Sequence, residues 1–203
     1  MPRGQDTKMD AAIRLLKAKG SVRPRDLAEH GIPPDYLDRL YRRGLVERVS
    51  RGVYSWPEAE VTEHHSIAEA VRQVPRGVIC LLTALSFHGL TTQSPHEVWL
   101  ALAPKAWAPR IKYPKIRIMR FSGPALTEMI EEHQIEGVTA QVFTPAKTVA
   151  DCFKFRNKVG LDVALEALRD CWREKRATMD ELWAAAHVCR MANVMRPYLE
   201  SLV

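Results

Sequence analysis

Three arginines in one predicted helix are the residues of this sequence best suited to a specific chemistry. Arg39, Arg42 and Arg43 are spaced so that they share one helical face. A guanidinium can donate two parallel hydrogen bonds, which suits the edge of a guanine or a phosphate group. The pattern therefore indicates contact with nucleic acid. Taken singly, each arginine could equally be solvated or pair with Asp35 or Asp38.

Short helices and a strand pair are needed to position that face, and the first 57 residues predict them. The expected elements are a helix capped by Asp6 or Thr7 and ended by Gly20, helices at 25–30 and 35–43, and strands at 45–49 and 53–56. This order is typical of a winged helix-turn-helix. In that fold the third helix enters the major groove and the strand pair lies along the phosphates.

The apolar spacing of these elements predicts which side chains point inward. We expect Leu27 and Ala28 of the second helix, and Leu37, Leu40 and Tyr41 of the third, to be buried. The residues left on the two DNA-facing elements and beside the second helix form the predicted DNA-binding set, which is Arg23, Arg25, Tyr36, Arg39, Arg42, Arg43, Arg48 and Arg51. For the set as a whole, contact with DNA is the favoured interpretation.

Positive charge is concentrated in this segment. Residues 1–57 of the 203 carry 12 lysines and arginines against 7 acidic residues, a net charge of +5, whereas residues 58–203 carry 18 against 17. A basic unit joined to a nearly neutral one suggests a nucleic-acid module attached to a domain with another task. A solvated basic face without a polyanionic partner is the alternative that charge alone leaves open.

Composition excludes several other classes of protein. Hydrophobic residues make up 46% and charged residues 27%, which argues against disorder. The longest apolar run, at 78–82, is far shorter than the roughly 20 residues of a membrane span, and the first residues contain no apolar signal region. We therefore expect a cytoplasmic protein with no membrane partner. The cysteines form no C-x-x-C pair and are expected to be buried thiols: Cys80, Cys152, Cys171 and Cys189.

The rest of the chain predicts a larger α/β domain, which makes the fold class mixed α/β. We divide the chain into a winged helix-turn-helix at 1–57, a linker at 58–65 and an α/β domain at 66–203. Helices are expected at 66–74 (with Ser66 and Glu69 as a capping box), 78–88, 123–133, 144–155, 161–173, 178–188 and 191–202, and strands at 97–102, 115–121 and 137–143. These elements predict a small sheet of at least three strands covered by helices.

Histidines are the first candidates for catalysis or metal binding in this domain. His64, His65, His88 and His96 have no second histidine or cysteine at a metal-ligand spacing, so we expect no metal site. His88 stands beside a glycine at a predicted helix end, where a capping or packing role is the favoured interpretation.

Other catalytic signals are also weak. Asp151 and Lys154 are three residues apart on one helix, and a salt bridge between them is favoured over a phosphate site. The phosphate-binding, dinucleotide-binding and serine-hydrolase glycine motifs do not occur in the sequence. We therefore expect no cofactor and no enzymatic activity.

A second basic patch is predicted around the strand at 115–121. It comprises Arg110, Lys112, Lys115 and Arg117, and alternation places the last two on one face of the strand. This patch could extend the DNA footprint, meet an acidic protein surface or an RNA, or simply be solvated.

Four segments carry a resemblance to a known family. They are Leu40–Tyr54, Leu82–Thr91, Thr144–Arg156 and Val159–Leu168. In this order they resemble the AbiEi-type antitoxins of type IV toxin–antitoxin systems, which act in phage defence, and the resemblance covers nearly the whole chain.

The resemblance implies a DNA-binding antitoxin that represses its own operon, usually at inverted repeats, and counters a nucleotidyltransferase-like toxin. Inverted repeats would require two protomers on the DNA. Two alternatives remain open from the sequence. The larger domain could dimerise or sense a ligand in a stand-alone regulator, or it could be a nuclease or toxin-modifying enzyme.

Overall fold

The computed structural model describes residues 8–50, 52–56, 63–107, 109 and 111–202. The chain forms two compact units. One comprises the residues up to His65 together with Gln134–Val138, and the other comprises Ser66–His133 and Thr139–Val203. Within the described ranges, none of the helices is both long and apolar enough to cross a membrane.

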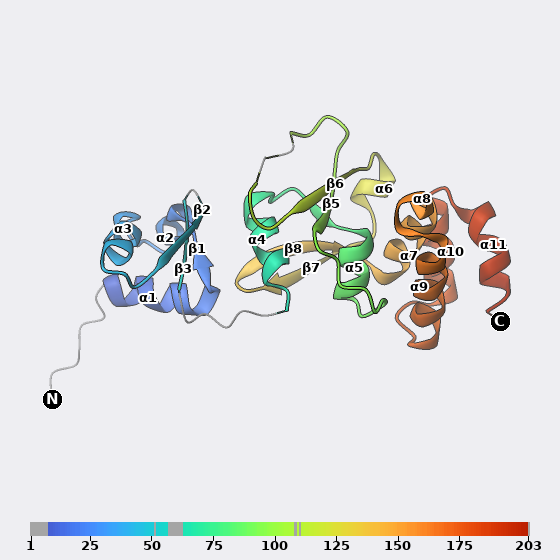
Figure 1. The fold of residues 1–203 in the computed structure, drawn as a ribbon, viewed down its shortest axis with the longest axis horizontal. Coiled ribbons are helices and arrows are strands. Elements are labelled where there is room, and N and C mark those ends of the chain that lie inside the picture. Colours follow the sequence, from blue (N-terminus) through green and yellow to red (C-terminus); the bar gives the residue numbers. More distant parts are fainter. Residues whose placement is uncertain (1–7, 51, 57–62, 108, 110, 203) are drawn as a thin grey trace. The chain divides into compact units, whose positions relative to one another are not determined.

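The first unit consists of short helices and a small antiparallel sheet. Its elements are α1 (Lys8–Lys19), β1 (Ser21–Val22), α2 (Pro24–Glu29), α3 (Asp35–Arg42), β2 (Glu47–Ser50) and β3 (Val53–Ser55) (Figure 1). The strand order is β1-β3-β2. This is the predicted succession of three helices and a returning strand pair, with the short strand β1 added at the sheet edge. The predicted caps of α1, Asp6 and Thr7, lie outside the described residues.

The core of this unit comes from all of its helices and from the sheet. Ala12, Leu16, Leu27, Leu37 and Leu40 are buried together with residues of the strands. Gly20, Gly31 and Gly44 follow the three helices in the left-handed conformation, with φ between +68° and +69°. Glycine adopts this conformation without the steric cost that a Cβ imposes, which explains why each helix ends where it does.

Two of the side chains predicted to be buried are exposed. Ala28 is exposed, because a helix of six residues presents only Leu27 to the core. Tyr41 is 49% exposed. Its ring contacts the buried ring of Tyr54 edge-on, with 6.2 Å between centroids, so Tyr54 occupies the core position that the helical spacing assigned to Tyr41.

The second unit has a five-stranded sheet with the order β6-β5-β4-β8-β7. Its elements are α4 (His65–Gln73), β4 (Val78–Ile79), α5 (Leu81–Phe87), β5 (Val98–Leu102), β6 (Ile116–Arg120), α6 (Pro124–Thr127), β7 (Ile130–Ile135), β8 (Val138–Phe143), α7 (Pro145–Lys154), α8 (Arg156–Val159), α9 (Leu161–Arg173), α10 (Met179–Val188) and α11 (Ala192–Glu200). Strand β4 is parallel to β8 and antiparallel to β5, and β5 is parallel to β6. The mixed α/β class is confirmed.

Three local predictions in this unit were wrong. The helix expected at 78–88 begins only at Leu81, because the two residues of β4 complete the sheet between β5 and β8. The helix expected at 123–133 is reduced to α6, and the residues from Ile130 form strand β7 beside β8. Ser66 does not cap α4, because the helix already includes it and the Glu69 carboxylate binds Arg72 instead.

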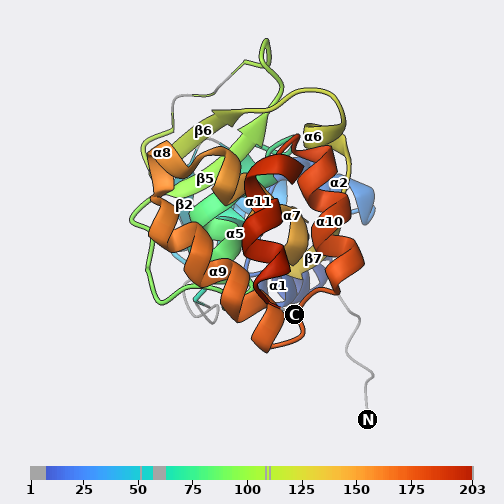
Figure 2. The same cartoon turned by 90° about the vertical axis from the view of Figure 1, so that its right-hand side faces the viewer.

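Helix α7 is the centre of the second core. Every residue from Ala146 to Phe153 is buried, and α7 contacts α5, α8, α9, α10 and α11. Figure 2 shows α9, α10 and α11 arranged around α7. The helix begins as predicted, with the hydroxyl of Thr144 accepting a hydrogen bond from the backbone N–H of Lys147 and a proline in the first turn.

A buried ion pair lies on this helix. The ammonium of Lys147 donates to the carboxylate of Asp151, and both side chains are fully buried. The Lys147 nitrogen also lies 3.9 Å from the centroid of the Phe143 ring, and the Cys189 thiol donates to Asp151 at 3.2 Å. The predicted pair of Asp151 with Lys154 was therefore wrong. Lys154 is exposed, whereas Lys147, one turn before Asp151, lies on the buried face of the helix.

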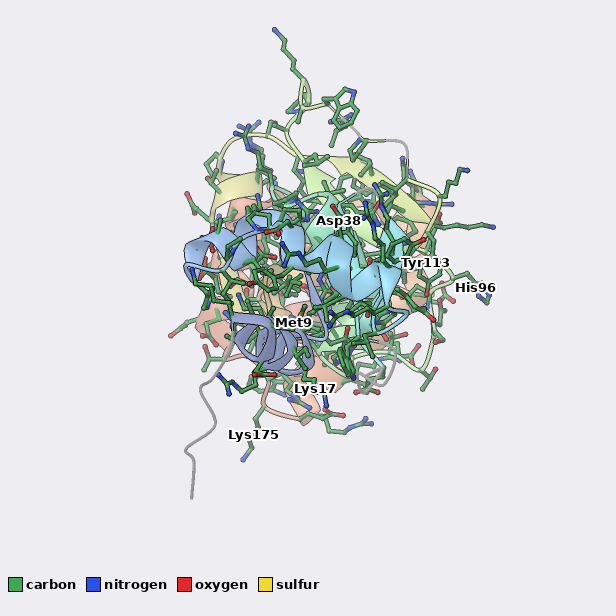
Figure 3. The ribbon with its side chains drawn as sticks, turned by 90° about the vertical axis from the view of Figure 1, so that its left-hand side faces the viewer. Met9, Lys17, Asp38, His96, Tyr113 and Lys175 are labelled. Atoms are coloured by element: carbon green, nitrogen blue, oxygen red, sulfur yellow. The ribbon has the colours of Figure 1, made fainter. Side chains whose placement is uncertain are left out.

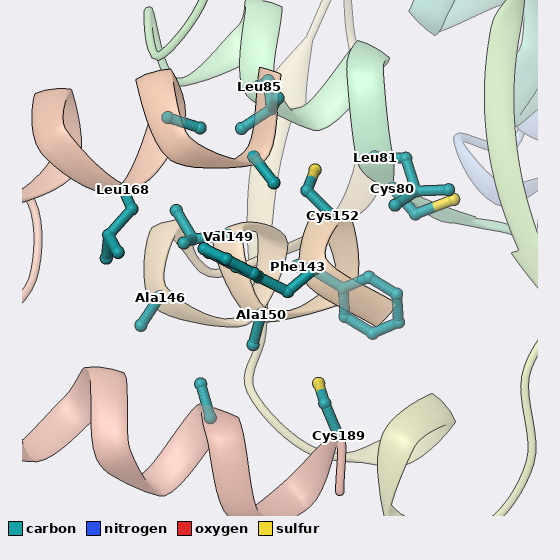
Figure 4. Close-up of a cluster of buried hydrophobic side chains, with 14 of the residues drawn as sticks. Cys80, Leu81, Leu85, Phe143, Ala146, Val149, Ala150, Cys152, Leu168 and Cys189 are labelled. Atoms are coloured by element: carbon teal, nitrogen blue, oxygen red, sulfur yellow. The ribbon is translucent and has the colours of Figure 1, made fainter. Parts of the chain in front are cut away.

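All four cysteines are buried free thiols, as predicted. Cys80, Cys152 and Cys189 lie in the cluster around α7 (Figure 4). Burial raises the pKa of each thiol, and that of Cys171 reaches about 12. These thiols are therefore protonated at neutral pH and act as small apolar side chains.

Replacing Asp151 by alanine is expected to lower the free energy of unfolding of the second unit by about 3–5 kcal/mol, because the Lys147 ammonium would remain buried without a counter-ion. Urea denaturation followed by circular dichroism measures this loss. Lys147→Met combined with Asp151→Leu removes both charges and should cost clearly less than Asp151→Ala alone.

An exposed pair gives the matched control for this experiment. Arg173→Ala breaks a bond to Asp170 in which the arginine side chain is 73% exposed, and it should change stability by less than about 1 kcal/mol. A double variant at 147 and 151 that is as unstable as Asp151→Ala would contradict the account of the buried pair.

Candidate nucleic-acid interface

Helix α3 presents its polar face to solvent because its apolar face is fixed in the core. Leu37 and Leu40 are almost completely buried. Gly44 ends the helix, with its N–H donating to the carbonyl of Tyr41. Fully burying a leucine stabilises a fold by roughly 1.5–3 kcal/mol, so these two side chains fix the rotation of α3 about its axis. The opposite face then carries Asp35, Arg39 and Arg42.

The first turn of α3 is acidic, and both of its carboxylates have partners. Arg39 forms a salt bridge with Asp35 at 2.8 Å, and its guanidinium lies 5.0 Å from the centroid of the Tyr36 ring. Both members of the pair are more than half exposed, so the interaction is weak and can be exchanged for another partner. The guanidinium of Arg39 is therefore already in contact with groups of the protein, unlike those of the arginines that follow it.

The second carboxylate, that of Asp38, is held by strand β3 of the sheet. The Tyr54 hydroxyl donates to it at 2.6 Å. This hydrogen bond is the main cause of the raised pKa of Tyr54, and burial adds to the effect. The bond joins α3 to β3 and directs the negative charge of Asp38 toward the protein. Local sequence patterns do not predict this link, because 16 residues separate the partners.

Arg42, Arg43 and Arg48 are exposed, and among the described residues none of them forms a salt bridge. Arg42 and Arg43 stand at the end of α3, and Arg48 stands on β2 directly opposite Tyr54 in the sheet register. The arginines predicted to bind DNA from the wing and from α3 are thus on neighbouring elements of one unit. Their guanidinium groups are available to an anionic ligand.

The remaining predicted contacts lie around α2 and the turn of the wing. Arg25 is exposed and its guanidinium is 3.7 Å from the carboxylate of Asp26. Arg23 is half-buried before the helix, and its backbone N–H donates to the same carboxylate at 2.7 Å. Arg51 lies outside the described residues. Contact with DNA stays a prediction for all eight residues of the set.

The second basic patch is less uniform than its sequence suggests. Lys112 and Lys115 are exposed, whereas Arg110 lies outside the described residues. Arg117 bonds to Glu97 at 2.6 Å, and its guanidinium is 4.6 Å from the centroid of the Trp99 ring. Its charge is therefore balanced within the protein, and the lysines carry the surplus charge of this patch.

His88 has the packing role that its position suggested. Its Nε2 donates to the carbonyl of Phe143 at 2.7 Å, and burial lowers its pKa. The neutral imidazole thus joins the end of α5 to the end of β8. In the described part of the chain, no group of three or more histidine, cysteine or acidic side chains is placed to hold a metal ion.

A scan against protein families gives a match that covers α2, α3 and the whole three-stranded sheet. Residues 10–56 match the transcriptional regulators of the AbiEi antitoxin family. The resemblance drawn from the sequence is confirmed for this AbiEi-type segment, which includes nearly all of α1 and ends just after β3. A comparison with curated proteins gives no match.

Arg42→Ala and Arg43→Ala are expected to weaken binding of the AbiEi-type segment to its DNA site and to leave stability unchanged, because both side chains are exposed. Loss of a contact to a base edge should cost about 1–3 kcal/mol, which fluorescence anisotropy with a labelled duplex measures. Arg169→Ala, which removes an exposed arginine from α9, is the matched control. Equal affinity of the wild type and the double variant would exclude α3 as the reading helix.

Tyr54→Phe tests the bond between the AbiEi-type sheet and α3. The change frees the Asp38 carboxylate on the helix predicted to face DNA, so affinity for DNA should fall several-fold while stability falls by about 1 kcal/mol. Adding Asp38→Asn removes the charge and should restore DNA affinity. If Tyr54→Phe lowers stability but binds DNA as tightly as the wild type, the bond has no positioning role.

Proposed function

We propose that this protein is a DNA-binding antitoxin of the AbiEi type that represses the operon encoding it. Helix α3 enters the major groove of the operator, and the β2–β3 wing follows the phosphates. The observation that carries the proposal is the coincidence of the family match at 10–56 with exposed arginines on α3 and β2 that have no acidic partner in the described residues.

The charge distribution along α3 supports a particular way of reading DNA. Its carboxylates lie in the first turn and its arginines in the last, as a helix dipole favours. Because Asp35 and Asp38 are occupied by Arg39 and Tyr54, their repulsion of phosphates is reduced. The C-terminal half of α3, with Arg42 and Arg43, is therefore the part that contacts the bases.

We further propose that residues 1–57 form the DNA-binding domain, that 58–65 connect it, and that 66–203 counter a nucleotidyltransferase-like toxin. The larger unit has its own core and its own sheet, which suits a separate binding task. Two protomers would occupy an operator of inverted repeats in the cytoplasm. The role is one of binding rather than catalysis.

Salt dependence tests the mode of DNA binding. Phosphate neutralisation makes log K fall linearly with log salt, with a slope of about −0.9 for each phosphate contact. The full-length protein binding to a duplex from upstream of its gene should show a log–log slope of several units. Fluorescence anisotropy between about 50 and 200 mM salt measures this slope. Arg48→Ala should reduce the slope by about 1. A flat titration would count against the proposal.

Growth rescue separates the two roles. Co-expression of the adjacent gene with the Arg42→Ala, Arg43→Ala variant should preserve rescue and co-purification of the two proteins, while a reporter for the operon loses repression. Loss of rescue in this variant, with Arg169→Ala normal, would mean that the DNA face also acts on the toxin. An adjacent gene product that is harmless and does not co-purify would favour a stand-alone regulator.

A further inference from the structure

The loop between β5 and β6 displays aromatic side chains that the core does not use. Trp107 is 80% exposed and Tyr113 is 57% exposed, and they are the two most exposed large hydrophobic side chains of the described residues. Leaving an indole in water forgoes most of the stabilisation that its burial would provide. Exposed aromatic rings of this kind are typical of surfaces that bind a partner.

The loop is tied to the fold at both ends. The guanidinium of Arg120 donates to the carbonyls of Ala103 and Ala106, each at 2.8 Å. At the other end, the side-chain amide of Gln73 donates to the carbonyl of Tyr113 at 2.8 Å. Both aromatic residues thus adjoin anchored backbone. Such anchoring lowers the entropy that the loop would lose on binding a ligand.

The charge of the loop is entirely positive. Residues 103–115 contain four lysines and arginines and no aspartate or glutamate. Lys105, Lys112 and Lys115 are exposed, and no salt bridge to them occurs among the described residues. Arg110 belongs to the same stretch but lies outside those residues, and nothing below depends on it. A polyanion fits this surface better than a neutral or basic partner does.

A hollow adjoins Tyr113. It has a volume of about 290 Å³ and is lined by Ser66, Pro95, His96, Glu97, Tyr113 and Lys115, among others. His96 and Tyr113 lie near one another along the same edge of the view in Figure 3. The volume is near the lower limit for a small-ligand site, which suits a single planar ring with its sugar.

We propose that this loop and hollow bind an unpaired segment of nucleic acid. Bases stack on Trp107 and Tyr113, one of them entering the hollow, while phosphates lie along Lys105, Lys112 and Lys115. Alternating aromatic and cationic groups are the chemistry by which proteins hold single strands. A protein partner is disfavoured, because lysine is depleted in the cores of protein–protein interfaces.

The test uses the full-length protein carrying Arg42→Ala and Arg43→Ala, which weakens the duplex face. The probes are fluorescein-labelled 12-mers of uridylate and of thymidylate, together with a blunt duplex of the same length without the operator sequence. Anisotropy gives the affinity. Because the chain has five tryptophans, stacking on Trp107 is reported by the part of the tryptophan quenching that Trp107→Ala abolishes.

Both single strands should bind more tightly than the duplex and quench tryptophan fluorescence. Trp107→Ala and Tyr113→Ala should each weaken binding at least about five-fold, as expected for loss of one stacked base. Lys112→Ala should reduce the salt slope by about 0.7. Leu161→Ala and Lys158→Ala, which remove an exposed apolar side chain and an exposed lysine elsewhere, are the matched controls and should change nothing.

The two oligonucleotides distinguish the source of the strand. Tighter binding of uridylate would indicate RNA, and equal binding would indicate a site that accepts either RNA or DNA. The proposal fails if neither strand binds, if the duplex binds as well, or if Trp107→Ala binds like the controls. It also fails if Trp107→Ala leaves oligonucleotide binding intact and abolishes co-purification of the adjacent gene product, because the loop would then be a protein-docking surface. Operator binding by wild-type α3 is measured separately, so either proposal can fail alone.

Discussion

The buried contact between Lys147 and Asp151 is the interaction around which the larger unit is built. A charge removed from water is tolerated only where partners replace its hydration. Here the ammonium has the carboxylate and the Phe143 ring, and the carboxylate also has the Cys189 thiol. These partners come from α7, the end of β8 and the residue after α10, so the pair is satisfied only when all three segments are in place. It therefore favours one arrangement of the helices over alternatives that would pack the same apolar side chains.

The smaller unit uses charge in the opposite way. Its hydrophobic cluster includes the ring of Tyr54, and Arg39, Arg42, Arg43 and Arg48 stay in solvent. The Tyr54 hydroxyl is what connects the core to the charged face, because it reaches Asp38 on α3. Apolar packing fixes the rotation of α3, and this single hydrogen bond sets which of its charges remain exposed. An anion approaching the last turn of α3 meets two arginines and no free carboxylate of Asp35 or Asp38.

Helices with strong local signals could be predicted from the sequence. Helix α9 has the predicted bounds, and Thr144 and Thr178 cap α7 and α10 with their side chains, because propensity and capping act within a few residues. Strand β7 could not be predicted, since its glutamates favour a helix over a strand and pairing beside β8 overrides that preference.

The candidate interface shows the same division between local and distant effects. The positions of Arg42 and Arg43 on the solvent face of α3 follow from helical spacing alone. The partner of Asp38, the burial of Tyr54 in place of Tyr41, and the choice of Lys147 over Lys154 as the partner of Asp151 all depend on residues brought together by folding. Spacing along the chain identifies which groups can meet, and the core decides which of them do.

The low reactivity of the four buried cysteines has a practical consequence. Each thiol is buried, and each is held in its protonated form by its apolar surroundings. The thiolate is the nucleophile that attacks maleimides and thiol-reactive nitroxide labels, so the native protein reacts with these reagents hardly at all while it remains folded. A cysteine placed at an exposed position of the β2 strand or of the β5–β6 loop would carry a dye or spin label alone, without removal of any native sulfur. The native chain can therefore be used without further changes for distance and mobility measurements with a label on β2 or on the β5–β6 loop.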